Sequence, residues 1–200
     1  YEEIGHEDTA FQKQQIQAEI DDVNAIKKTT SRIQSNAKIK ALKTAIHTAF
    51  EYQEKQGIPQ KVVVFTESKR TQKYIASELR KDGFDEDDIL LFNGDFNDAM
   101  TKEIYRAWKV KNFGKTNYGR GVEYKHAIVD YFKEHSRILI VTDAGSEGLN
   151  LQFCNTVINY DLPWNPQKIE QRIGRCHRYG QKHDVVAINL LNTGNEADRR

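Results

Sequence analysis

The chain has 200 residues, and its content of 38% hydrophobic and 30% charged residues is that of a globular protein. No apolar run approaches the roughly 20 residues that a membrane span needs, so we do not expect the chain to associate with a membrane. The formal net charge of +1 means that any basic surface must be local. The two cysteines, Cys154 and Cys176, are too few for a disulfide framework, which favours a reducing compartment such as the cytoplasm.

The length allows one main domain with a helical extension. Apolar residues recur at helical spacing in the first part of the chain, but they are too sparse there to form a core alone. We therefore predict a helical lead-in over residues 1–36 and the main domain over residues 37–200. The chain starts at Tyr1 without an initiator methionine, and we expect a fragment of a longer polypeptide.

Short apolar runs without polar alternation predict buried β-strands, which occupy residues 61–65, 89–92, 137–142, 156–161 and 184–191. Helical patterns precede the first of these strands and lie between the others. This alternation predicts an α/β fold, an open and mainly parallel sheet with flanking helices. In such sheets functional groups gather beyond the carboxyl ends of the strands, so the loops after residues 65, 92, 142 and 161 are the candidates.

The loop after the third predicted strand reads TDAGSEGLNLQ over residues 142–152. Its two glycines and small hydroxyl residues suit a backbone that approaches a phosphate closely and offers N–H groups to it. An ordinary glycine-containing turn is the alternative.

A dense cationic stretch, NPQKIEQRIGRCHRYGQ, covers residues 165–181. Its proline suits the first turn of a helix, with Ile169, Ile173 and either Cys176 or His177 expected to face the sheet. The arginines at positions 172, 175 and 178 recur every three residues, a spacing that would let them converge on one anion. A solvated cationic helix face is the alternative.

These stretches resemble a known family. QRIGRCHRYGQ, residues 171–181, resembles motif VI of superfamily-two helicases and translocases, and its HRYGQ is similar to the HRIGQ of Swi/Snf-type remodelling ATPases. The 142–152 loop resembles their motif V, and KVVVFTESKRTQKYIASEL, residues 61–79, resembles their motif IV. The motifs occur in the family's order, and the resemblance covers roughly residues 37–195.

The resemblance implies two RecA-like lobes with ATP and Mg²⁺ between them. The first lobe of such enzymes carries the phosphate loop and the Asp-Glu box. Neither motif is present in this sequence. The GKT at residues 114–116 is not a phosphate loop, because Lys109 stands where that loop requires a glycine. The chain is therefore expected to be the second, C-terminal lobe, with the first lobe of the same polypeptide as its partner and as the main holder of ATP and Mg²⁺.

The resemblance also assigns residues to the nucleotide. Arg175 and Arg178 match the arginine fingers that reach the γ-phosphate, and Gln171 would lie near the same catalytic site. Gly148 and Asn150 match motif V positions near the nucleotide. Asn150 stands where the related DEAD-box proteins have an aspartate, so a contact with the sugar hydroxyl would be made by an amide and not by a carboxylate.

A second group of residues is assigned to nucleic acid. Thr142 matches a motif V position close to a nucleic-acid phosphate. Thr66 and Ser68, in motif IV, would bond to the phosphate backbone, and Lys69 and Arg70 would attract it. For these two cations a solvated surface position is equally compatible with the sequence.

Some residues are expected to serve the fold instead. Arg172 lies outside the finger positions, and Glu170 or a neighbouring loop is its expected partner. Trp164 is expected to pack at the start of the motif VI helix. The long segment 99–123 combines basic and aromatic residues, which suits nucleic-acid contact, but packing of Trp108 and Phe113 onto the sheet is favoured. No histidine has partners at metal-ligand spacing, so no metal site is expected in the chain.

The function that the resemblance implies is that of the C-terminal lobe of an ATP-dependent, Swi/Snf-like DNA translocase acting on double-stranded DNA. Such a protein would be cytoplasmic, and nucleoid-associated in a prokaryote. Two alternatives stay open: a helicase lobe acting on RNA or single-stranded DNA, and a non-catalytic nucleic-acid-binding scaffold.

Overall fold

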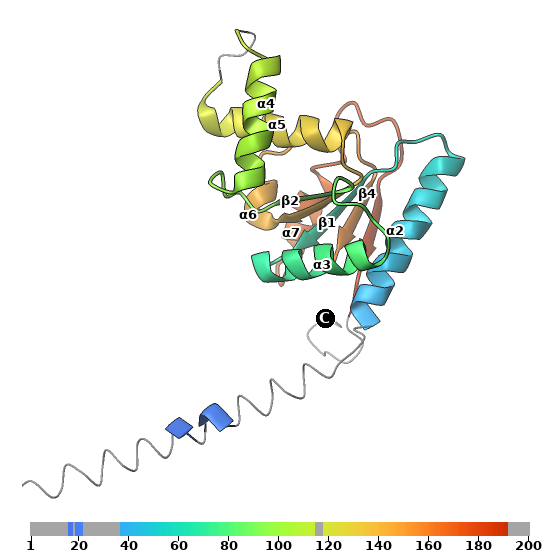
Figure 1. Ribbon diagram of the computed structural model, residues 1–200. Coiled ribbons are helices and arrows are strands. Elements are labelled where there is room, and N and C mark those ends of the chain that lie inside the picture. The colour runs from blue at the N-terminus through green and yellow to red at the C-terminus, as the bar shows by residue number, and fades with distance from the viewer. Residues whose placement is uncertain (1–15, 18, 22–36, 115–117, 192–200) are drawn as a thin grey trace, which may run out of the picture. The chain divides into compact units, whose positions relative to one another are not determined.

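The computed structural model describes residues 16–17, 19–21, 37–114 and 118–191 (Figure 1). The chain divides into two units, Tyr1–Ala37 and Lys38–Arg200. In the first unit the described residues are helical, and Ile16 and Ile20 are exposed, as the sparse apolar pattern predicts. The rest of the predicted lead-in lies outside the described residues. Among the described helices none is long and apolar enough to span a membrane.

The second unit contains a five-stranded sheet in which every pair of neighbouring strands is parallel. Its strands are β1 (Val62–Thr66), β2 (Ile89–Phe92), β3 (Ile138–Thr142), β4 (Thr156–Asn159) and β5 (Val186–Asn189). Their order in the sheet is β2-β3-β1-β4-β5. Every residue of β1, β3 and β4 is buried, which is why their sequences show no polar alternation. The predicted α/β class and parallel sheet are confirmed.

Helices cover both faces of the sheet (Figure 1). They are α2 (Ala37–Lys55), α3 (Lys69–Lys81), α4 (Ala99–Lys111), α5 (Arg120–Glu134), α6 (Asp143–Ser146) and α7 (Pro166–Ile173). Alternate strand residues point to opposite faces. Val62 and Val64 therefore pack with α2 and α3 in one core, while Val63 and Phe65 pack with α4 and α5 in the other.

A buried polar network holds α2 to the sheet. The Gln53 side chain, 0% exposed, donates from Nε2 to the Lys61 carbonyl at 2.8 Å and to Asn155 Oδ1 at 2.7 Å. The Lys61 amide donates back to Gln53 Oε1 at 3.1 Å. Because a buried amide without partners would be destabilising, this reciprocal pairing fixes the position of α2 along the sheet.

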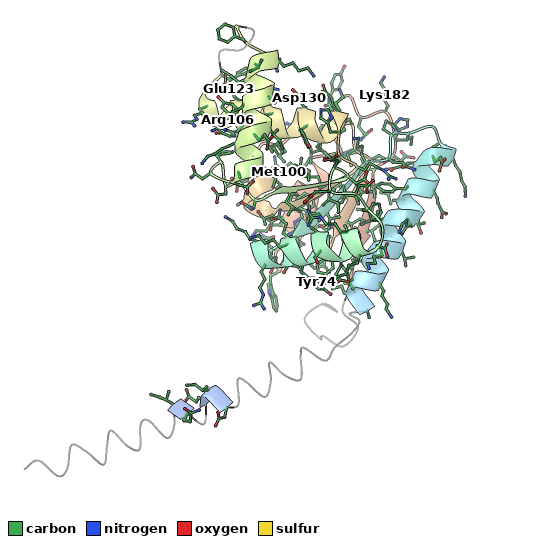
Figure 2. The ribbon with its side chains drawn as sticks, viewed as in Figure 1. Tyr74, Met100, Arg106, Glu123, Asp130 and Lys182 are labelled. Carbon is green, nitrogen blue, oxygen red and sulfur yellow. The ribbon has the colours of Figure 1, made fainter. Side chains whose placement is uncertain are left out.

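The long segment before α5 forms α4, which packs on α5. Trp108 is buried, and its Nε1 donates to Oδ2 of Asp130, labelled on α5 in Figure 2, at 2.7 Å. The expected packing of Trp108 is therefore confirmed. The same expectation for Phe113 is wrong, since this residue follows the end of α4 and is 84% exposed.

Candidate functional site

The carboxyl ends of β1, β3 and β4 lie at one edge of the sheet because these strands are adjacent and parallel. Thr66 and Thr142 are paired in register at the ends of β1 and β3. The structure thus brings Thr66 of motif IV and Thr142 of motif V together at one edge of the sheet.

In this structure the motif IV hydroxyls have partners within the chain. Thr66 Oγ1 donates to Asp161 Oδ2 at 2.7 Å. Ser68 is the N-cap of α3, where its Oγ accepts the Thr71 N–H at 3.0 Å and satisfies an otherwise unpaired helix amide. Lys69 is more than half exposed and pairs with Asp95 at 3.2 Å. These contacts orient the side chains at the edge of the sheet.

The motif V loop begins with the short helix α6, which Thr142 caps by accepting the Gly145 N–H at 3.3 Å. A Cβ at Gly145 would lie 2.7 Å from the Phe92 carbonyl oxygen, so only glycine allows this loop to approach β2 so closely. Gly148 has a φ of +73°, a left-handed conformation that favours glycine. Gly148 and Asn150 line a hollow beside α5 together with Lys125.

The motif VI helix α7 starts as predicted, with Pro166 in its first turn and Asn165 as the N-cap. Its inward face differs in part from the prediction. Cys176 is fully buried beyond the helix end, whereas His177 is exposed, and Ile169 and Ile173 are half-buried. Trp164 was expected to pack before this helix but is 87% exposed, so that prediction is wrong.

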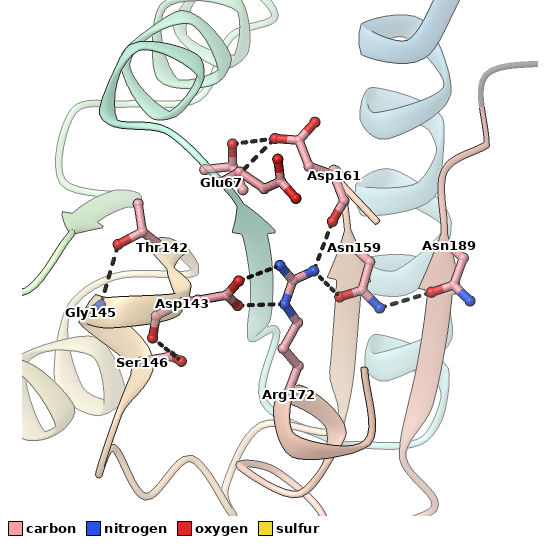
Figure 3. A network of polar contacts seen from close by, with 10 residues as sticks. Glu67, Thr142, Asp143, Gly145, Ser146, Asn159, Asp161, Arg172 and Asn189 are labelled. Carbon is pink, nitrogen blue, oxygen red and sulfur yellow. Dashed lines mark hydrogen bonds and ion pairs between the residues drawn. The ribbon is translucent and has the colours of Figure 1, made fainter. Parts of the chain in front are cut away.

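Arg172 is the most buried cation of the site, with 2% of its surface exposed (Figure 3). Its guanidinium makes two hydrogen bonds to the Asp143 carboxylate, at 2.7 and 3.0 Å. Nη1 also donates to Asn159 Oδ1 at 3.0 Å and to the Asp161 carbonyl at 2.7 Å. Its partner is thus a neighbouring loop and not Glu170. The hypothesis that all three arginines converge on one anion is wrong for Arg172, because four of its five N–H groups already donate to acceptors within the chain.

Arg175 lies beyond the end of α7, in a hollow of about 100 Å³ that Gln171 also lines. Asp143, Ser146, Glu147, Lys168 and Arg172 complete the lining. Among the described residues the buried Nε of Arg175 has no hydrogen-bond partner. A buried donor without an acceptor is unfavourable, so this position of the Arg175 side chain has an unmet hydrogen bond within the part of the chain that the structure describes.

Arg178 is exposed and lines a different hollow, with His177, Lys182, His183 and the end of α2 around Tyr52. The structure therefore brings Gln171 and Arg175 together but places Arg178 apart from them.

A thiol pair lies beneath this segment. Cys154 and Cys176 are both 0% exposed, and Gln181 Nε2 donates to their carbonyl oxygens at 3.0 and 3.4 Å. A hydrogen bond with Cys154, together with burial, raises the pKa of the Cys176 thiol well above its ordinary value. Cys176 is therefore a packing residue with a protonated thiol.

Sequence reasoning missed Asp143, Asn159 and Asp161 as site residues. Their signal in the sequence was a polar residue at or directly after the end of a buried strand, the position where an open parallel sheet gathers its functional groups. Asp161 Oδ1 also lies 3.5 Å from Lys38 Nζ in the first turn of α2.

Residues 37–180 match the family model of the helicase conserved C-terminal domain. Among curated proteins, the uncharacterized ATP-dependent helicase YqhH of Bacillus subtilis is 40% identical over 133 residues, which is 66% of this chain and 19% of that protein. The RNA polymerase-associated protein RapA of Vibrio campbellii is 52% identical over 50 residues, 25% of this chain and 5% of RapA. The chain thus spans less than a fifth of the length of these relatives.

Solved structures share the fold. The C-terminal part of the Fun30 ATPase domain has a TM-score of 0.59 at 24% identity, covering 84% of this chain and 44% of that one. Domain 2 of the DEAD-box helicase Mss116p, bound to an RNA duplex, has a TM-score of 0.50 at 19% identity and covers 76% of this chain and 50% of that one.

Proposed function

We propose, since this chain belongs to the helicase conserved C-terminal domain family, that it is the second RecA-like lobe of an ATP-dependent, Swi/Snf-like DNA translocase. Residues 37–200 would form this lobe and residues 1–36 a helical lead-in from the first lobe. The HRYGQ sequence and the similarity to YqhH and RapA support this reading. Such a protein would act in the cytoplasm, at the nucleoid in a prokaryote.

The observation that carries the proposal is the unpartnered Nε of Arg175. Each guanidinium nitrogen of Arg172, three residues earlier, has an acceptor, whereas the Arg175 Nε has none among the described residues. If the Arg175 side chain turned outward, an ATP phosphate presented by the first lobe would supply the acceptor. Arg175 would then act as an arginine finger that stabilises the charge developing on the γ-phosphate, with Gln171 beside it.

Arg178 would be the second finger. Its exposure is compatible with reaching a group held by another lobe, but its separate hollow requires the segment after α7 to move when the lobes close. Gly148 and Asn150, in motif V, would lie near the nucleotide. Mg²⁺, which neutralises phosphate charge, would be held mainly by the first lobe.

Nucleic acid would bind along the carboxyl edge of β1 and β3. Thr142, Thr66 and Ser68 would contact backbone phosphates, and Lys69 would add charge attraction. Contacts to the backbone alone do not select a sequence, which suits a motor that moves along a duplex.

The test is ATP hydrolysis by the complete parent polypeptide, measured with double-stranded DNA, single-stranded DNA and RNA in parallel. We expect duplex DNA to stimulate most. Arg175→Ala and Arg178→Ala should each lower the stimulated kcat by about 10³-fold, the size of effect that arginine fingers have elsewhere. Arg106→Ala, at an exposed arginine of α4, is the matched control and should leave kcat unchanged.

Stimulation mainly by RNA or single strands would instead favour a strand-separating helicase. If no nucleic acid raised the rate, or if both finger variants kept the full rate, the proposed function would be wrong and a non-catalytic scaffold would be the better description.

A further inference from the structure

Arg172 is at the centre of a polar network that joins the separate loops of the site (Figure 3). We define the Arg172 network by the residues bonded in series around it: Lys38, Thr66, Asp143, Asn159, Asp161, Arg172 and Asn189. These residues come from α2, β1, α6, the end of β4, α7 and β5. No single element of the lobe positions this edge by itself.

One arm of the network leads to motif V. The bidentate pair between Arg172 and Asp143 holds the residue that directly follows Thr142. Such a planar pair fixes orientation as well as distance, which a lysine could not do. The position of α7 is thereby set relative to the Thr142 cap.

The other arm leads to motif IV. The Asp161 carbonyl accepts from Arg172, while its carboxylate accepts the Thr66 hydroxyl at 2.7 Å and the Glu67 N–H at 3.1 Å. Asp161 thus joins α7 to the end of β1. A displacement of Thr66 must either move Asp161 or break one of these bonds.

The network continues to Arg175 through the backbone. Arg175 is three residues after Arg172, its N–H donates to the Arg172 carbonyl at 3.1 Å, and its own carbonyl accepts the Leu151 N–H at 2.9 Å. The segment carrying Arg175 is therefore attached at one end to Arg172 and at the other to the end of motif V.

We infer that Arg172 and Asp161 are positioning residues, which couple the placement of Thr66 and Thr142 to that of Arg175. This inference rests on the proposed function for the roles of those three residues. It goes beyond that function by assigning the coupling to one buried guanidinium and one carboxylate. The inference assigns both residues a role through their contacts within the chain, without requiring that either bind the nucleotide or the nucleic acid.

The experiment uses the complete parent polypeptide with Arg172→Lys, Asp161→Ala and Asp161→Asn. Asparagine keeps a side-chain oxygen that can accept from Thr66 and Glu67, whereas alanine does not. We expect Arg172→Lys and Asp161→Ala to lower the nucleic-acid-stimulated kcat by about 10- to 100-fold with little change in KM for ATP, because small misplacements of a catalytic group have effects of that size. Asp161→Asn should restore most of the rate.

Amide hydrogen exchange supplies a readout that does not depend on activity. Asp161→Ala removes the acceptor of the Glu67 N–H directly, so faster exchange at Glu67 is expected whether or not the network couples distant residues. The network predicts faster exchange also at Leu151, which bonds to the Arg175 carbonyl and does not touch Asp161. Arg172→Lys should have the same effect at Leu151, and Asp161→Asn should not.

The inference is overturned if Asp161→Ala changes exchange at Glu67 alone and leaves Leu151 protected. It is also overturned if Asp161→Asn is as impaired as Asp161→Ala. If Arg172→Lys fails to fold, the comparison of Asp161→Ala with Asp161→Asn still tests the coupling. If the unaltered protein shows no stimulation by nucleic acid, the proposed function fails, while exchange at Leu151 still tests the coupling.

Discussion

Two regions of this lobe that are both rich in cations differ in the burial of those cations. At the carboxyl edge of the sheet Arg172 is 2% exposed and bonds to a carboxylate, an amide oxygen and a carbonyl. On the layer formed by α4 and α5, Lys109 and Lys111 pair with Glu123 and Glu134, and the two lysine side chains are 42% and 65% exposed. The buried cation joins several chain segments, whereas the pair of Lys111 and Glu134, exposed on both sides, adds little to what packing already provides.

Arg172→Met is expected to lower the stability of the protein more than the other changes described below. The change leaves the Asp143 carboxylate without its partner, and we expect the free energy of unfolding to fall by about 3 kcal/mol, the low end for a broken buried pair because Asp143 is 32% exposed. Urea unfolding followed by circular dichroism measures it. Arg106→Met, the same change at an exposed arginine of α4, should cost under about 0.5 kcal/mol. Equal losses in the two variants would contradict the comparison.

Gly145→Ala tests the close approach of motif V to β2. The added Cβ would meet the Phe92 carbonyl oxygen at 2.7 Å and the Asn93 Cα at 2.9 Å, both backbone atoms that cannot rotate away. Overpacking of this kind costs roughly 1–3 kcal/mol, and we expect about 2 kcal/mol from the same unfolding measurement. Gly121→Ala, where a Cβ would meet nothing within 4 Å, is the control. An unchanged stability in Gly145→Ala would mean that the loop has room to move.

Trp108→Phe tests what holds the α4 and α5 layer together. Phenylalanine keeps one aromatic ring but removes the second ring of the buried indole and the hydrogen bond from Nε1 to Asp130, so we expect a loss of about 1–2 kcal/mol. The remaining tryptophan of the chain, Trp164, is 87% exposed, so the variant should fluoresce at the long wavelengths of solvated indole. A blue-shifted emission from the variant would show that Trp164 is covered in solution.

Lys111→Met should have the smallest effect. Its ion pair with Glu134 is formed by two half-exposed side chains, where water and salt screen the attraction. We expect the free energy of unfolding to be nearly unchanged at low salt and unchanged at high ionic strength. A large loss of stability that does not depend on salt would show that this surface ion pair stabilises the fold as the buried Arg172 contacts do.

Much of the fold could be predicted because burial on both faces leaves a local signal. The apolar runs of β1 and β3 specify strands without reference to the rest of the chain. The strand order could not be predicted in this way, since placing β1 between β3 and β4 depends on packing between residues far apart in the sequence.

The site was predictable as a set of loops but not as a set of contacts. Arg172 was grouped with Arg175 and Arg178 by spacing, yet its acceptors Asp143 and Asn159 lie 29 and 13 residues away in the sequence. The regular spacing also implied a continuous helical turn, whereas α7 ends at Ile173. Trp164 was misjudged because an aromatic residue near a proline resembles a packing residue whether or not a pocket exists for it.

The pairing of Gln53 with Lys61 and Asn155 has a practical consequence for recombinant work. A truncated protein that begins after α2 would expose the apolar surface that Leu42, Ile46 and Phe50 cover, and would leave the Asn155 side chain without its amide partner. We expect such a truncation to aggregate during expression. The shortest protein that keeps both cores intact therefore begins at Ala37.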